Sequence, residues 1–233
     1  MNLCNRKSVA GWLALAAAVA GVGWSAAQGQ DDEAARRERT VKNLMELGLA
    51  MHRYHDAHKE FPTAAYYNKE GKPLLSWRVA VLPYVGQKKL YEQFNLDEPW
   101  DSTHNKKLLA KMPDVFAVGD AAKQKGATYY QVFTGKATAF DGKKGLRIPN
   151  DFPDGTSNTI LIIEAKDAVP WTKPADLPYD AKKPLPKLGG LFKDGFHAAL
   201  ADGSVRFIRR TISARTLRDA ITRDDGNVLG SDW

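Results

Sequence analysis

The stretch VKNLMELGLAMHRYHDAH, residues 41–58, decides the fold. Its apolar residues Leu44, Leu47 and Met51 recur at steps of three and four, which places them on one face of a helix. The charged run DDEAARRERT before it is compatible with the same helix. The Phe-Pro pair that follows ends the helix, because a residue before proline avoids the helical region. We therefore predict one amphipathic helix over residues 31–60.

The rest of the chain changes from helical to strand character along its length. Short helical patterns fill residues 76–111, and three β-rich stretches follow, TYYQVF at 128–133, TILIIEA at 159–165 and HAALADGSVRFI at 197–208. The last stretch contains an Asp-Gly pair that suits a two-residue hairpin turn. A helix followed by hairpin-connected strands predicts an α+β fold, in which a long N-terminal helix packs on an antiparallel sheet.

The first residues have the pattern of a targeting segment. Arg6 and Lys7 precede an uncharged apolar run over residues 9–24, and small residues follow it. The run is shorter than the about 20 residues that a stable membrane-spanning helix needs. We predict a secretory signal peptide over residues 1–27, a single α+β domain over residues 28–233, and an extracytoplasmic location in the periplasm or at the cell surface. The alternative is an uncleaved signal that anchors the protein, which would then be its membrane contact.

The charge balance argues against nucleic acid as a partner. The formal net charge is +7, and the basic residues are spread out apart from a denser stretch at 206–218. A spread of this kind is typical of a solvated surface, or of contact with anionic surface polymers. We expect partners among envelope proteins or surface glycans. The single cysteine, Cys4, lies in the predicted leader, so the mature chain has no disulfide.

Two groups of side chains have the chemistry of metal ligands. Histidines at 52, 55 and 58 lie on the predicted helix, but steps of three leave neighbouring side chains about 60° apart, so all three cannot face one ion. The loop NDFPDGTSNT offers oxygen donors of the kind that Ca²⁺ prefers, although packing and turn roles suit both groups as well. We predict no metal and no cofactor. The candidate ligands, should a metal bind, are His52, His55, Asp154 and Asn158.

A proline-rich segment, residues 167–190, is predicted as a long surface loop and as a place for an interaction surface. Aromatic side chains beside it suit contacts with sugars or proteins, and we name Trp100, Trp171 and Tyr179 as a candidate binding surface. The alternative is that these rings fix loops onto the core, as aromatic residues next to prolines commonly do.

Catalytic residue types are present without a catalytic signature. The chain has no nucleophile elbow and no glycine-rich phosphate loop, so we predict no catalytic residue. Glu164 follows the strand-forming residues ILII and is the candidate for a buried polar role. The types that hydrolysis would need are Ser157, Ser204, His197, Asp202 and Glu164.

Several strings together resemble a known family. They are NLMELGLAMHRYHDAHKEFP, LSWRVAVLPYV, LYEQFNLDEPWDSTHNKKLL, DGTSNTILIIEA, VPWTKPADLPYD and ADGSVRFI, and the resemblance covers residues 33 to about 223. They are similar to the large planctomycete family of exported proteins of unknown function, many of which carry a type IV pilin-like N-terminus and an H-X9-DG motif near the C-terminus. The resemblance implies a fold like a pilin or pseudopilin head, with no established activity.

This chain departs from that family pattern in two places. The prepilin signal is absent, and an Ala-rich secretory signal stands in its place. Counted back from Asp202, the histidine of the H-X9-DG motif falls on Phe192, so no role of that histidine is transferred to His197. The expected function is a non-catalytic, exported envelope protein, a pilin-like structural or binding module. An extracytoplasmic solute- or glycan-binding protein is the first alternative, and an unrecognised hydrolase is the second.

Overall fold

The computed structural model describes Met1, residues 17–118 and residues 126–233, with the backbone alone over residues 17–31. The predicted leader, residues 1–27, therefore lies partly outside the described residues. The chain divides into two compact units, Met1–Arg37 and Glu38–Trp233.

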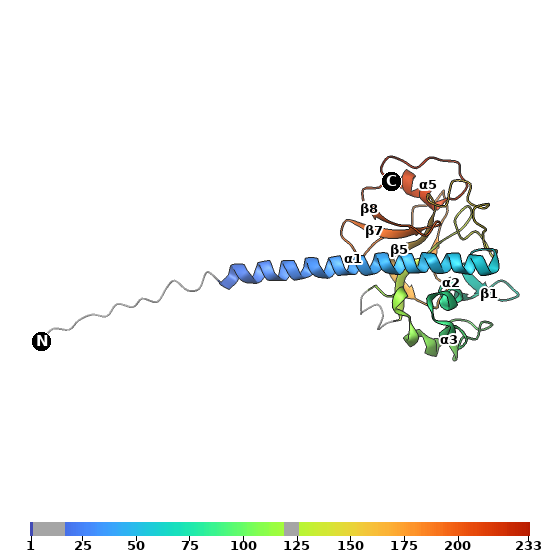
Figure 1. The fold of residues 1–233 in the computed structure, drawn as a ribbon, viewed down its shortest axis with the longest axis horizontal. Helices are drawn as coiled ribbons and strands as arrows, with labels where there is room; N and C mark the ends of the chain where they lie inside the picture. Colours follow the sequence, from blue (N-terminus) through green and yellow to red (C-terminus); the bar gives the residue numbers. More distant parts are fainter. Residues whose placement is uncertain (2–16, 119–125) are drawn as a thin grey trace. The chain divides into compact units, whose positions relative to one another are not determined.

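Helix α1 runs from Ala17 to His58 (Figure 1). It starts earlier than the predicted boundary, and its end agrees with the prediction. The helix ends where Lys59 takes a left-handed conformation with φ of 64°, while its N–H still donates to the carbonyl of His55. In the first unit, the guanidinium of Arg37 lies 2.6 Å from the carboxylate of Glu33, one turn earlier on the helix surface.

The second unit contains the predicted antiparallel sheet. Its four strands lie in the order β3-β5-β7-β8, and every neighbouring pair is antiparallel. The central strand β5 has all of its first six residues buried, which fits a strand covered on both faces. The bounds are β3 Ala127–Gln131, β5 Ile160–Pro170, β7 Gly195–Leu200 and β8 Val205–Arg209.

Both faces of the sheet carry a hydrophobic core. On one face, Leu44, Leu47 and Met51 of α1 belong to the same cluster as Ile162 of β5 and Ala199 of β7. On the other face, the second cluster joins the sheet to helix α5, Ala214–Ile221. The second unit is therefore an α+β fold with three layers, α1, sheet and α5 (Figure 1).

Short elements between α1 and the sheet extend the first core. None is longer than seven residues, so their stability comes from packing and not from helix propensity. They are β1 Ala65–Tyr67, β2 Pro73–Ser76, α2 Trp77–Ala80, the 3-10 helix η1 Leu82–Val85, α3 Lys88–Tyr91, and the 3-10 helices η2 Asn105–Lys111 and η3 Asp114–Phe116.

Helix α1 contacts the loop between β7 and β8 through a glycine. A Cβ atom added to Gly48 would lie 3.2 Å from the Cα of Gly203, in the loop between β7 and β8. The N–H of Leu200 donates to the carbonyl of Ser204, and these two residues close the loop. Of the residues between them, Gly203 alone has a positive φ, of 86°. The hairpin therefore has a three-residue loop instead of the predicted two-residue turn. Gly48 is thus required by packing, although glycine weakens the helix locally.

The segment 167–190, predicted as a surface loop, is partly built into the sheets. Its first four residues belong to β5, and β6, Leu177–Pro178, pairs in parallel with β4, Phe133–Thr134. Near its end, the N–H of Gly189 donates to the carbonyl of Glu164. The segment follows the edge of the sheet because its backbone polar groups find partners there.

Candidate functional site

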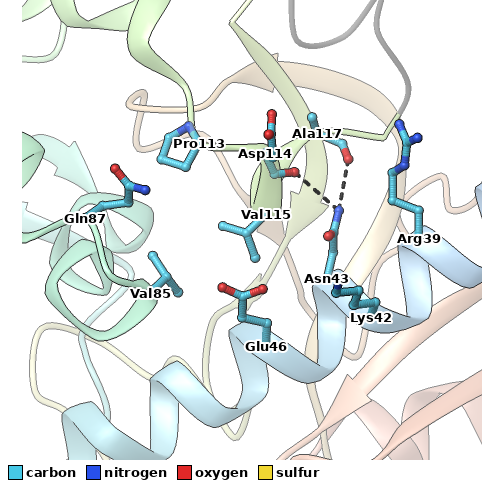
Figure 2. Close-up of a pocket in the computed structure, with 10 residues that line it drawn as sticks. All are labelled: Arg39, Lys42, Asn43, Glu46, Val85, Gln87, Pro113, Asp114, Val115 and Ala117. Atoms are coloured by element: carbon cyan, nitrogen blue, oxygen red, sulfur yellow. Dashed lines mark hydrogen bonds between the residues drawn. The ribbon is translucent and has the colours of Figure 1, made fainter.

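A charged cleft in the second unit is the candidate functional site (Figure 2). It has a volume of about 520 Å³, which lies within the range of roughly 300–1,000 Å³ that is common for small-molecule sites. Its lining comes from α1, from the end of η1 and from the region of η3. The lining residues are Arg39, Lys42, Asn43, Glu46, Val85, Gln87, Pro113, Asp114, Val115 and Ala117.

Helix α1 forms one wall of the cleft with four residues. Arg39, Lys42, Asn43 and Glu46 are separated by steps of one, three and four, so the helix presents them along one side. Arg39, Lys42 and Glu46 are exposed, whereas Asn43 is buried. The helix therefore supplies two cations and one carboxylate to a water-accessible surface.

Asn43 fixes the opposite wall. Its side-chain amide donates to the carbonyl of Ala117 at 3.0 Å and to the carbonyl of Asp114 at 3.4 Å (Figure 2). These two carbonyls lie at the start and just past the end of η3, and that of Asp114 also accepts the backbone N–H of Ala117 at 2.9 Å. The bonds attach η3 to α1 and hold the cleft at a set width.

The cleft combines opposite charges with apolar walls. In Figure 2 the carboxylate of Glu46 points toward Val115, and Gln87 lies on the far side of Val85. None of the ten described lining residues is a serine, threonine, cysteine, histidine or tyrosine. The lining can bind charged groups and hydrogen-bond an amide through Gln87, and it offers none of the usual hydroxyl, thiol or imidazole groups of covalent catalysis.

The predicted metal ligands on α1 do not converge. The ring of His52 packs against Phe61 at 5.6 Å, and Nε2 of His55 accepts a hydrogen bond from the N–H of Ile148 at 3.2 Å. His58 stacks on Tyr54 at 4.1 Å. Burial lowers the pKa of His55, with the charges of His52 and Lys59 acting in the same direction and Asp56 opposing them. The three rings thus contact different partners, as expected for side chains that a step of three places at different angles around a helix.

The loop NDFPDGTSNT, the other candidate for a metal, makes hydrogen bonds with the backbone. The carboxylate of Asp154 accepts hydrogen bonds from the N–H groups of Asp225 and Gly226, at 2.7 and 3.0 Å. The amide of Asn158 donates to the carbonyl of Asp154 at 2.8 Å. Asp154 thus fastens this loop to the segment that follows α5, and Asn158 closes the loop on itself. Across residues 17–118 and 126–233, no three His, Cys, Asp or Glu side chains are grouped to hold a metal ion.

The aromatic candidates for a binding surface mostly belong to the core. Trp171 is completely buried, stacks on Phe116 at 5.7 Å and donates its indole N–H to the carbonyl of Leu109. Tyr179 is only 7% exposed and packs on Phe133. Trp171 is therefore corrected from a binding platform to a core residue, because its ring and its polar atom both have internal partners. Trp100 is half-buried, with the ammonium of Lys173 over its ring at 5.4 Å.

Glu164 is fully buried beside a second polar residue. Its Oε2 accepts hydrogen bonds from the backbone N–H of His197 at 2.5 Å and pairs with Nδ1 of the same residue at 3.0 Å. Tyr130 lies opposite Glu164 on β3, and burial raises the pKa of its hydroxyl. His197 is 4% exposed and Glu164 is not exposed at all, so this pair is closed to any substrate.

The sequence analysis missed a buried ion pair between Arg78 and Asp176. Their side chains are 0% and 3% exposed, and Nη2 of Arg78 lies 2.8 Å from Oδ1 of Asp176. Arg78 also donates to the carbonyl of Tyr130, and Asp176 accepts from the N–H of Val132. Burial raises the pKa of Asp176 and lowers that of Arg78, while the contact between them opposes both shifts. The signal available in the sequence was Arg78 itself, a charged residue among the apolar residues of SWRVAVL.

The denser basic stretch is mostly used inside the molecule. Arg210 donates to the carbonyls of Phe192 and Lys193, and Arg218 donates to those of Ala181 and Lys183. The guanidinium of Arg206 lies 4.8 Å from the ring centroid of Trp233. Most of this charge therefore fastens loops and is less available to an anionic polymer.

Comparison with known proteins gives a family of unknown function. Residues 33–118 are similar to a family described as "Protein of unknown function (DUF1559)". No curated protein and no solved structure matches the chain. Among the residues that the structure describes, no helix is both long and apolar enough to cross a membrane. The family segment contains all ten residues of the cleft, so the candidate site lies entirely within the part of the chain that is similar to DUF1559.

Proposed function

We propose that this protein is a non-catalytic, exported protein of the cell envelope, with an architecture like a pilin head, that binds a small polar ligand in the charged cleft. The observation that carries the proposal is the cleft itself, a concave surface with two cations, carboxylates and an amide around apolar side chains. The leader pattern at residues 1–27 supports export. The order of a long helix followed by an antiparallel sheet supports the pilin-like architecture.

The cleft can be tested by thermal-shift screening against charged and polar solutes. A ligand present at about 100 times its Kd stabilises a folded protein by about 2.7 kcal/mol, which raises the melting temperature by several degrees. We expect at least one solute class to do so in the wild type and not in the variant Arg39→Gln/Glu46→Gln. Glu38→Gln, an exposed position of α1 outside the cleft, is the matched control.

The binding proposal fails under either of two outcomes. One is that no solute class shifts the melting temperature at millimolar concentration. The other is that the stabilising solutes act equally on the wild type and on the double variant, which would place their site elsewhere.

A second candidate function, binding of a solute or glycan, is favoured by a different cavity. This cavity has a volume of about 780 Å³ and lies between the 167–190 segment and α5. Tyr179, Asp180 and Lys182 come from the segment, and Arg218 and Asp219 come from α5. Aspartate, lysine and arginine side chains can hydrogen-bond sugar hydroxyls.

Variants separate this second site from the charged cleft. Asp180→Asn/Lys182→Ala should abolish glycan binding and leave binding in the cleft unchanged. A glycan screen in which the wild type and this variant behave alike would discard the second candidate. For the hydrolase alternative, Ser204 donates to Asp202 within the hairpin loop while His197 is paired with Glu164, so these candidate residues are divided between two local pairs.

A further inference from the structure

The charges in the cleft are arranged in order along α1. Arg39 and Lys42 lie toward the N-terminal end of its wall, and Glu46 lies toward the C-terminal end. With a rise of 1.5 Å per residue, Arg39 and Glu46 are separated by about 10 Å along the helix axis. The α1 wall of the cleft therefore has a cationic end and an anionic end, and Asp114 adds a second carboxylate from the opposite wall.

These opposite charges do not neutralise one another. In the described part of the chain, Glu46 forms no ion pair within 4.0 Å, although Lys42 lies one turn before it. A lysine that precedes a glutamate by four residues has the weaker of the two helical orientations for pairing. Both charges are thus available to a ligand.

Between the two ends the cleft offers apolar contacts and an amide. Val85, Val115 and Pro113 line it, and Gln87 has a side-chain amide that both donates and accepts hydrogen bonds. The middle of a matching ligand should combine apolar substituents with neutral polar groups. Peptide bonds and small side chains have this composition.

The axial spacing of about 10 Å between these two helix positions sets the approximate length of such a ligand. An extended chain advances about 3.3–3.6 Å per residue, so a peptide of three residues spans about 10 Å between its terminal groups. A free amino acid carries its ammonium and its carboxylate on one carbon atom and cannot reach both ends. An arginine can bind a terminal carboxylate through two parallel hydrogen bonds, and a glutamate accepts from a terminal ammonium.

We infer that the cleft binds a short peptide of about three residues with free termini, with its ammonium on Glu46 and its carboxylate on Arg39 and Lys42. This inference rests on the proposed function, because it names the ligand class of the same cleft. Recognition of the two termini selects peptides by length, and the apolar middle tolerates small side chains.

Calorimetric titration of the purified protein with an alanine series tests the inference. We expect tri-alanine to bind at least tenfold more tightly than free alanine, and N-acetyl or C-terminal amide blocking to weaken it by about tenfold each. Glu46→Gln should remove the effect of N-acetylation alone, and Arg39→Gln should reduce the effect of amidation alone. Glu38→Gln should behave as the wild type.

Three outcomes contradict the inference. Equal binding of alanine and tri-alanine excludes length selection, equal binding of blocked and free peptides excludes recognition of the termini, and no peptide binding at all excludes the ligand class. In each case a non-peptide solute that depends on Arg39 and Glu46 would leave the proposed function standing. If no solute of any class depends on them, both fail.

Discussion

At the residue scale, the Arg78–Asp176 pair connects three segments that are distant in sequence. Arg78 is the second residue of α2, Asp176 lies in the 167–190 segment, and both reach the backbone at the end of β3. Neither ion has access to water, so each depends on the other for its charge and on neighbouring groups for its hydrogen bonds.

Removal of one partner should therefore be costly. Asp176→Asn leaves a buried guanidinium without a counter-charge, and we expect a loss of about 3–5 kcal/mol in the free energy of unfolding. Urea denaturation at neutral pH measures this loss. Asp180→Asn, whose side chain is 46% exposed, should change stability by less than about 0.5 kcal/mol. Equal free energies of unfolding for the two variants would show that the Arg78–Asp176 pair stabilises the fold no more than an exposed side chain does.

His55 should make the fold sensitive to mild acid. Its folded pKa lies below the ordinary 6.5 because burial disfavours the imidazolium, and its Nε2 must be unprotonated to accept from Ile148. A base with a lowered folded pKa contributes stability that is fully present above pH 6.5 and is lost as the pH falls below it. We expect the melting temperature to fall between pH 7.5 and 5.5, a window set by that ordinary value.

The variant His55→Gln isolates this contribution. The glutamine side chain does not titrate between pH 7.5 and 5.5. The difference in melting temperature between wild type and variant should therefore shrink as the pH falls. His104→Gln is the matched control, because His104 contacts the exposed carbonyl of Gln93 and not the α1 region. A difference that stays constant with pH would contradict the assignment to His55.

At the element scale, the contact between α1 and the β7–β8 loop determines how closely the helix approaches the sheet. Gly48 meets the backbone of Gly203, which cannot rotate away as a long side chain could. An alanine inside a helix is ordinarily favoured over glycine by about 1 kcal/mol.

We expect Gly48→Ala to reverse that preference. The added methyl group lies 3.2 Å from the Cα of Gly203, and overpacking of this kind costs about 1–3 kcal/mol. Ala35→Gly, at an exposed position in the interior of the same helix, measures the propensity alone and should cost about 1 kcal/mol. A Gly48→Ala variant more stable than the wild type would show that the helix can move away from the loop.

The elements also show what the sequence could predict. The helix end, the strands and the α+β class followed from periodicity and β propensity, because each signal is local and agrees with burial in one layer. The predicted length of the hairpin loop was one residue too short, because an Asp-Gly pair fits both a two-residue turn and a longer loop with a single left-handed glycine. The partial strand structure of residues 167–190 depended on partners that lie far away in the sequence.

The candidate site was less predictable for the same reason. Arg39, Lys42 and Glu46 look like the solvated face of an amphipathic helix, and only the position of η3 opposite them makes a cleft. Asn43 gave no signal, because its role depends on carbonyls more than 70 residues away in the sequence. The environment of Trp171 stayed open in the sequence, because an aromatic beside a proline fits both a surface platform and a buried anchor, and its burial places it in the core.

At the scale of the whole molecule, export is the property that the leader predicts. A chain cleaved after Ala27 should begin at Gln28 and be recovered from the periplasmic or cell-surface fraction. Mass spectrometry of the native protein measures its N-terminus, and a reporter fused to residues 1–27 measures export by itself. Recovery of an intact Met1 chain from the cytosol would overturn the export proposal, whereas an intact chain in the membrane fraction would support the anchor alternative.

The buried central strand β5 also has a consequence for the unfolded chain. Ile160, Leu161, Ile162 and Ile163 are shielded on both faces in the native fold, yet the same run is the sort of segment that stacks into intermolecular β-structure when it is exposed. The adjacent Glu164 carboxylate introduces a repulsive charge into any such stack. Dilution from denaturant should therefore yield soluble protein at low concentration and precipitate at high concentration, which light scattering measures.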